Sequence, residues 1–412
     1  MNPARTGRVV VLWCAFLLVH LVTAWTGWLY PSQPMGDVVL VYEPWASSAL
    51  SGGAIVGVTE TWVYPQLGLV PMLVAKVAAA PLVPLLGVAG AYLVAWAVLV
   101  TAVGALAFGV LLGRSPTRPR RAAAWFWCAA VLLLGPIAMY RLDALTVPIA
   151  VIGGLWLASR PAVAAALLTV GAWIKIWPGA LVLAALVAGR ERIRMLLAAA
   201  AVTAAVIVGL LLLGADAEVF GFLTEQTGRG LQIEAVAATP FLWMAVAGAA
   251  RIEYSFEILT FQIRASGADA VSTALTPLMV LVVAAVTALA VVKALRGAAF
   301  ARLFPPSALT LVAALIVTNK VGSPQFQTWL LAPLILWIVF DGPRSRIPAV
   351  IVLALCGLTC LIYPLAYDAL LAAEPLAVAL LTARNLLLVV LLVVGIRALA
   401  RVPSARPSRT RK

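Results

Sequence analysis

Few side chains in this sequence are suited to acid–base or anion chemistry, and they gather in short segments. Asp37 follows a turn rich in proline and glycine, YPSQPMGD, and is the only acid near the start of its segment. A carboxylate in this position can act as a general base, and it can also cap the short helix predicted to follow it. The residues leave both roles open for Asp37.

The segment TNKVGSPQFQTWL (318–330) predicts an anion site. Ser323 followed by proline is a favourable start for a helix, because serine caps well and proline fits the first helical position. The free N–H groups of such a helix start, beside Lys320, form the kind of site that holds a phosphate. Asn319 and Gln325 can add hydrogen bonds. The alternative is an ordinary capped turn whose lysine extends to the membrane surface.

Other polar residues lie at the ends of apolar stretches and in a second long segment. Each alone is explained as a side chain that reaches the membrane interface, but several on one predicted face favour a shared pocket. The candidates for this pocket are Tyr64, Arg141, Asp143, Lys175, Arg229, Gln232, Glu234 and Arg384.

Arg384 lies inside the last apolar stretch, where a charge requires a partner or water. Asp368 and Glu374 are the partners considered, and the shared pocket is the alternative.

The elements that must position these residues are strongly apolar. Of 412 residues, 64% are hydrophobic and 11% are charged, whereas soluble domains are about 45–50% apolar. Apolar stretches of about 20 residues recur along the chain, which excludes a soluble protein and indicates an all-α polytopic membrane protein with one domain, 1–412. About twelve transmembrane helices are predicted, at 8–30, 88–113, 122–140, 144–159, 161–177, 178–189, 195–214, 271–292, 303–319, 326–340, 347–366 and 376–400.

The net charge of +14 gathers on one predicted side of the membrane. If the N-terminus is cytoplasmic, the inner loops hold most of the Lys and Arg residues and only Glu191 and Asp341 among the acids. By the positive-inside rule, both termini are then cytoplasmic, in a multi-pass protein of the cell membrane. A nucleic-acid partner is not expected, because no basic face with interleaved aromatic residues is present.

Two long segments, 31–87 and 215–270, are predicted on the extracytoplasmic side. They are too apolar to be disordered and are expected to carry helices lying along the membrane surface. In the first, Tyr42 and Trp45 share a helical face that we expect at the level of the lipid headgroups. Alternating polar and apolar residues over 252–266 predict a small hairpin in the second.

Residues 67–86 are apolar but contain three prolines and Lys76. A straight helix exposed to lipid is therefore disfavoured. We expect a re-entrant or tilted segment on the outer side, packed against protein. The alternative is that 88–113 is broken into two short crossings.

The arrangement of these residues resembles the bacterial glycosyltransferase family 87, integral-membrane enzymes of the GT-C superfamily that include polyprenyl-phosphate-mannose-dependent mannosyltransferases. The similarity covers nearly the whole chain in layout, and its most specific parts are RGLQIEA (229–235) and NKVGSPQF followed by Trp329 and Leu330. The weaker matches are Asp37, Tyr64-Pro65, Arg141 with Asp143, and Lys175 with Pro178. The chain departs from the family pattern at Gln66, where a second proline is usual, and at Ala235, where serine is usual.

The resemblance implies a GT-C-like fold. It also implies transfer of a hexose, with mannose as the expected sugar, from a polyprenyl-phosphate-linked donor to a lipid or glycan acceptor. Transfer would take place on the extracytoplasmic face, with inversion and with Asp37 as the catalytic base. The partners implied are membrane lipid, the donor and the acceptor. The expected donor-binding residues are Lys320, Asn319, Ser323, Gln325, Arg229 and Lys175.

No divalent metal or other cofactor is expected, since the acids in the outer segments, Asp37, Glu43, Glu60 and Asp143, are scattered along the sequence.

Two other classes of protein are consistent with the composition. A transporter or flippase of a lipid-linked envelope precursor would place polar groups in the middle of the membrane and show paired broken helices. A structural subunit would not depend on Asp37 or Lys320. Polar residues at the ends of the predicted spans favour chemistry at the interface over transport.

Overall fold

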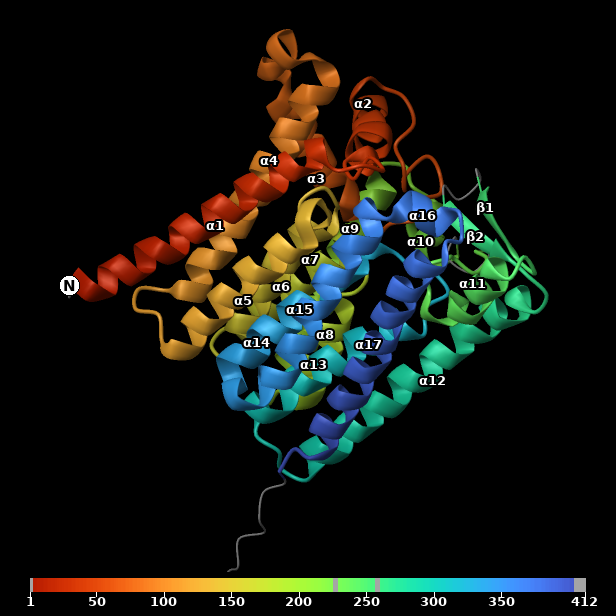
Figure 1. Cartoon of the computed structure of the whole chain (residues 1–412). Helices are drawn as coiled ribbons and strands as arrows, with labels where there is room; N and C mark the ends of the chain where they lie inside the picture. The colour runs from red at the N-terminus through yellow and green to blue at the C-terminus, as the bar shows by residue number, and fades with distance from the viewer. Residues whose placement is uncertain (1–2, 225–228, 256–259, 404–412) are drawn as a thin grey trace, which may run out of the picture.

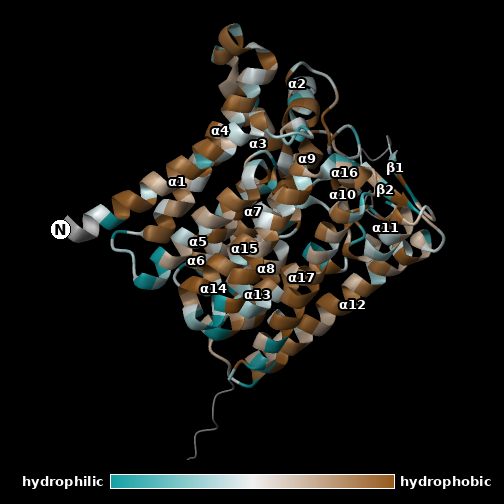
Figure 2. Ribbon diagram, in the orientation of Figure 1, coloured by the Kyte–Doolittle hydropathy of each residue, from teal (hydrophilic) through white to brown (hydrophobic). Residues whose placement is uncertain are grey.

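The computed structural model describes residues 3–224, 229–255 and 260–403 as a bundle of helices with one small β-hairpin (Figure 1). Within these residues, eight helical stretches are long and apolar enough to cross a membrane, so the chain is an all-α polytopic membrane protein. Figure 2 shows hydrophobic residues over most of the helical surface and hydrophilic residues mainly near the helix ends and in the hairpin.

The helices and strands follow the predicted order, and each of the twelve predicted apolar segments contains a helix. The long helices are α1 (Pro3–Leu29), α4 (Val83–Leu112), α5 (Arg118–Leu134), α9 (Arg192–Leu212), α12 (Ala268–Leu295), α13 (Phe300–Val317), α15 (Arg346–Cys360) and α17 (Pro375–Ala400). The shorter helices are α2 (Glu43–Leu50), α3 (Leu69–Ala79), α6 (Asp143–Trp156), α7 (Pro161–Ile174), α8 (Gly179–Ala188), α10 (Gly221–Thr224), α11 (Thr239–Val246), α14 (Leu331–Asp341) and α16 (Tyr367–Leu371). The strands are β1 (Arg251–Ser255) and β2 (Thr260–Arg264).

Three of the predicted spans are short helices inside the bundle. α6 and α7 have 14 residues each and α8 has 10, so at about 1.5 Å per residue each is shorter than the roughly 30 Å hydrocarbon core of a bilayer. Breaks at Pro161 and Pro178 separate them. Non-helical backbone at these breaks is tolerated where protein surrounds it. The count of twelve crossings therefore stays a prediction.

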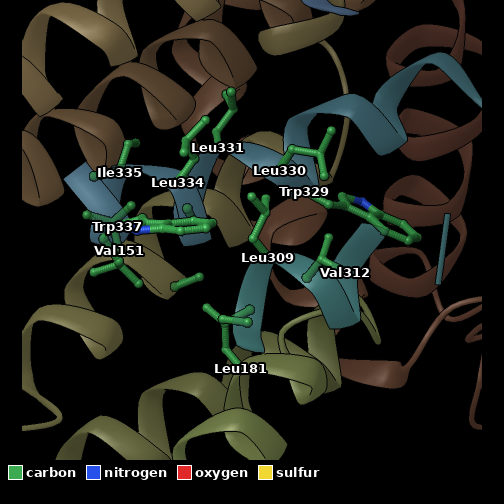
Figure 3. Packing of buried hydrophobic residues seen from close by; sticks show 14 of the residues in the cluster. Val151, Leu181, Leu309, Val312, Trp329, Leu330, Leu331, Leu334, Ile335 and Trp337 are labelled. Atoms are coloured by element: carbon green, nitrogen blue, oxygen red, sulfur yellow. The ribbon is translucent and has the colours of Figure 1, made fainter. Parts of the chain in front are cut away.

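The core of the bundle lies where α14 packs against α13 and α6. In Figure 3, Leu309 of α13 lies beside Leu330, and Val151 of α6 lies beside Trp337 of α14. Residues 303–314 of α13 are buried without interruption. This close packing fixes the segment 319–330, which joins α13 to α14 and carries several of the predicted site residues.

The two long segments predicted outside the membrane lie at one end of the bundle, toward the upper right of Figure 1. We call it the loop end. The predicted hairpin is confirmed, since β1 and β2 pair antiparallel. Residues 231–233 add to β2, because Ile263 N–H donates to Leu231 O at 3.0 Å and Ile233 N–H donates to Phe261 O at 3.3 Å.

The predicted tilted segment over 67–86 is an arm formed by α3 and the first turns of α4, at the top of Figure 1. Within the first turns of α4, Gly87 interrupts the helix with φ 68°. Leu85, two residues earlier, is 82% exposed. One face of α3 packs against Tyr92 and Trp96 of α4 through Leu69, Met72, Ala75 and Ala79. The expected packing against protein is therefore found on one face, while the other face is apolar and exposed.

The first helix of the loop end packs inside the protein. A turn over Val38–Tyr42 continues into α2, and Tyr42 is 1% exposed, with its ring 5.2 Å from that of Trp96. The ring of Trp45 lies 5.4 Å from that of Trp62. The prediction that this face meets lipid headgroups is wrong for Tyr42, because the arm and α4 cover it.

Candidate functional site

Asp37 and Arg141 form an ion pair at the loop end. Arg141 Nε lies 3.3 Å from Asp37 Oδ2, with the arginine side chain 4% exposed and the aspartate side chain 38% exposed. In the described part of the chain, the Asp37 carboxylate makes no capping hydrogen bond to the following turn, so the capping interpretation is wrong. Burial lowers the pKa of Arg141, but Asp37 and Tyr363 raise it, and the net shift is upward. A charged, buried arginine thus holds a carboxylate that stays open to solvent.

The remaining donors of Arg141 hold the backbone that leads to Asp37. Arg141 Nη1 donates to Pro34 O and to Tyr140 O, both at 2.8 Å, and Nη2 donates to the Tyr363 hydroxyl at 3.1 Å. Sequence reasoning missed Tyr363, whose only signal was a Tyr-Pro step in an apolar stretch near the end of α15.

Lys175 joins two other predicted pocket residues, Tyr64 and Asp143, and Asp143 also binds Trp329. The Trp329 indole N–H donates to Asp143 Oδ1 at 2.5 Å. Lys175 Nζ lies 3.8 Å from Asp143 Oδ2 and 3.9 Å from the centroid of the Tyr64 ring. A carboxylate and an aromatic face together stabilise a buried ammonium. Lys175 is therefore directed toward Asp143, which competes with its predicted role at a donor phosphate.

Tyr42 lies between these two groups. Its hydroxyl accepts a hydrogen bond from Leu142 N–H at 3.4 Å, between Arg141 and Asp143 in the sequence. Burial raises the pKa of Tyr42 well above its ordinary value, and Asp37 and Asp143 add to that rise. Because Arg141 and Asp143 flank Leu142, the two groups are neighbours, and we describe them as one site.

Glu234 and Arg384 form a second, buried ion pair. Arg384 Nη1 donates to Glu234 Oε2 at 2.6 Å and Nη2 donates to Glu234 O at 2.7 Å, with the two side chains 2% and 3% exposed. Asn385 accepts from Arg384 Nη2 at 3.0 Å. Burial raises the pKa of Glu234, and Arg384 opposes that rise. Of the alternatives left open for Arg384, pairing with Asp368 or Glu374 is wrong, because Glu234 is its partner.

The segments containing Gln232 and Lys320 meet through their backbones. Gln232 N–H donates to Lys320 O at 3.0 Å, and both side chains are buried. Burial lowers the pKa of Lys320. Arg229 is the first residue of the stretch 229–235 that contains Gln232, and its carbonyl accepts a hydrogen bond from the Ser272 hydroxyl of α12 at 3.1 Å. The two most specific parts of the family resemblance are therefore neighbours in space.

The start of the segment 324–330 is helical, as predicted, but its caps differ from the expectation. Ser323 donates its hydroxyl to Gln325 Oε1 at 2.5 Å, and over the described residues it forms no side-chain cap. Asn319 Oδ1 accepts from Val321 N–H at 2.9 Å. The predicted capping role of Ser323 is wrong, because its hydroxyl is directed toward the Gln325 amide oxygen and accepts no backbone N–H from the described residues of the helix start. Asn319 and Gln325 are likewise already engaged within the segment.

Gly322 marks a close approach between the two segments. A Cβ at this position would overlap backbone atoms of Glu234 and Ala235, which cannot move aside as a side chain can. We expect Gly322→Ala to lower the free energy of unfolding by about 1–3 kcal/mol or more, as overpacking does. Thermal unfolding in detergent measures this. Gly209→Ala is the control, since a Cβ there meets nothing within 4 Å; equal stability of the two variants would contradict the close approach.

Comparison of the chain with protein-family models, with curated proteins and with solved structures finds no match. Within residues 3–224, 229–255 and 260–403, no three His, Cys, Asp or Glu side chains gather as a metal site requires. Metal independence stays a prediction. The site is therefore defined by its own geometry: an accessible carboxylate, a buried arginine, a lysine over an aromatic ring, and a second buried ion pair.

Proposed function

We propose that the chain is a membrane glycosyltransferase that moves a hexose, with mannose as first choice, from a polyprenyl-phosphate-linked donor to a lipid or glycan acceptor. The observation that supports this most is the Asp37–Arg141 pair, in which a solvent-open carboxylate is held by a buried cation. The proposal includes a GT-C-like architecture with about twelve crossings in the cell membrane. Both termini are cytoplasmic in it, and the loop end is extracytoplasmic.

In the proposed reaction, Asp37 takes the proton from the acceptor hydroxyl while that oxygen attacks the anomeric carbon of the donor sugar. The new C–O bond forms on the face opposite the phosphate, whose bond to the sugar breaks, so the anomeric configuration inverts. Polyprenyl phosphate leaves with the bonding electron pair. A cation such as Lys320 would stabilise the charge that develops on it. The proposed reaction uses no metal ion or other cofactor.

Purified protein in liposomes, supplied with radiolabelled polyprenyl-phosphate-mannose and membrane acceptor lipid, tests the proposal. We expect the label to move to the acceptor and the product linkage to be inverted. A transporter or flippase would carry the intact donor across the bilayer and leave its sugar in place. The absence of transfer from mannosyl, glucosyl and arabinosyl donors alike would contradict the proposal.

Lys320 is the cation proposed to meet the donor phosphate. We expect Lys320→Ala to raise the KM for the donor roughly 10-fold or more, because a hydrogen bond between charged groups contributes about 1.5–3 kcal/mol. Donor titrations in the liposome assay measure this. Lys293→Ala is the control, since its ammonium donates to Val402 O at 3.2 Å at the opposite end of α12. A donor KM within twofold of the wild-type value would contradict the assignment.

A further inference from the structure

The backbone before Asp37 is tied to the far end of the chain. The Tyr363 hydroxyl accepts from Arg141 Nη2 and lies 3.3 Å from Ser32 O and 3.4 Å from Gln33 O, to either of which it donates its proton. Arg141 binds Pro34 O, one residue further. The Tyr363 hydroxyl thus links Arg141, which pairs with Asp37, to the backbone segment that leads to Asp37.

The backbone of this segment, residues 32–34, has an uncommon conformation. Ser32 and Gln33 have φ values of 56° and 47°, in the left-handed region that residues other than glycine rarely adopt. Such a backbone persists only where surrounding contacts hold it. The contacts that hold it here include those of Arg141 and Tyr363 to the carbonyls of residues 32–34. Gly36 N–H also donates to Gln33 O at 2.8 Å, and the Ser32 hydroxyl makes a longer bond of 3.4 Å to Asp368.

We propose that Tyr363 is a positioning residue for Asp37, acting through Arg141 and through the backbone of residues 32–34. The inference rests on the proposed function, since it gives Tyr363 a part in the reaction that Asp37 is proposed to catalyse. Tyr363 touches neither Asp37 nor a reacting atom; it fixes where the carboxylate stands relative to the acceptor hydroxyl. Small displacements of a catalytic group reduce turnover strongly while substrate binding is kept.

Tyr363→Phe is the sharpest variant, because it removes one hydroxyl and keeps the ring, whose centroid lies 5.6 Å from the Arg141 guanidinium carbon. We expect kcat to fall roughly 10- to 100-fold, with the donor KM changed less than twofold. Amide hydrogen exchange of residues 32–37 is expected to become faster than in the wild-type protein. This second readout does not depend on any substrate.

Tyr92→Phe is the matched control. Tyr92 is also buried, and its hydroxyl donates to a single backbone carbonyl, Met72 O at 3.2 Å. The Tyr92→Phe variant is expected to lose about as much stability as Tyr363→Phe. It is expected to keep the wild-type kcat and the wild-type amide exchange over residues 32–37. A Tyr363→Phe protein that behaves in the same way would overturn the inference.

The outcomes separate the inference from the proposed function. If the wild-type protein transfers no sugar, the proposed function fails, and with it the positioning role of Tyr363 in that reaction. If the wild-type protein is active and Asp37→Asn is inactive, but Tyr363→Phe keeps its kcat, only the inference fails. A fall in kcat together with faster amide exchange supports the inference. If Tyr363→His recovers neither the kcat nor the slow exchange that Tyr363→Phe loses, the hydroxyl is required at the position that the tyrosine ring gives it.

Discussion

Asp37→Asn is expected to reduce sugar transfer by roughly 10²- to 10⁴-fold, the range that a general base contributes. The amide has nearly the shape of the carboxylate but cannot take a proton from the acceptor hydroxyl. Initial rates in the liposome assay measure the effect, and donor binding measured separately is expected to change little. The magnitude is large because Asp37 is the carboxylate that is both open to solvent and paired with buried Arg141.

Glu60→Gln is the control for this variant. Glu60 lies in the same long segment and its side chain is exposed, so the substitution removes a charge of the same sign without touching the site. We expect its rate to stay within twofold of the wild-type rate. Comparable activity of Asp37→Asn and the wild-type protein would remove Asp37 as the base and leave the proposed mechanism without support.

Arg384→Leu is expected to lower the free energy of unfolding by about 3–5 kcal/mol, because it leaves the buried carboxylate of Glu234 without its partner. Both side chains are almost completely buried, at 2% and 3% exposure. Burial already raises the pKa of Glu234, so loss of the guanidinium leaves a charge in a place where it is costly. Chemical unfolding in detergent micelles, followed by circular dichroism, measures the change.

Two further variants show whether the loss of stability in Arg384→Leu comes from the broken ion pair or from changed packing. The double variant Glu234→Leu with Arg384→Leu is expected to recover much of the loss, because replacing a whole buried pair costs less than breaking it. Arg264→Leu breaks an exposed pair with Glu253, at 55% and 53% exposure, and is expected to change stability by less than about 1 kcal/mol. An Arg384→Leu protein no less stable than Arg264→Leu would show that the buried pair does not stabilise the fold.

The sequence predicted those features that depend on local pattern. Long apolar runs located the helices, alternation over 252–266 predicted the hairpin, and Ser323 followed by proline predicted a helix start. Each signal is a continuous stretch of sequence, so one physical rule decides it. The grouping of the site residues could be expected only in part, from their shared place at the ends of the apolar stretches.

The failures concern choices between competing partners. Arg384 had several acids in reach, and the one it binds, Glu234, is 150 residues away in the sequence. Ser323 could cap the helix or bind Gln325, and nothing in a one-dimensional pattern ranks the two hydrogen bonds. Tyr363 gave no signal beyond a Tyr-Pro step, because its role comes from contacts with Ser32, Gln33 and Arg141, which only the folded chain brings beside it.

The pairing of Glu234 with Arg384 has a consequence for biosynthesis. During translation, Glu234 is added to the growing chain 150 residues before Arg384. Until then the carboxylate has no buried cation to accept it, and an unpaired charge stays in water rather than in the protein interior. The stretch 231–233 is therefore expected to dock in its final position after α17 has been inserted. The loop end then depends on a helix made 150 residues later, so the candidate site is completed after the segment that carries Glu234 has left the ribosome.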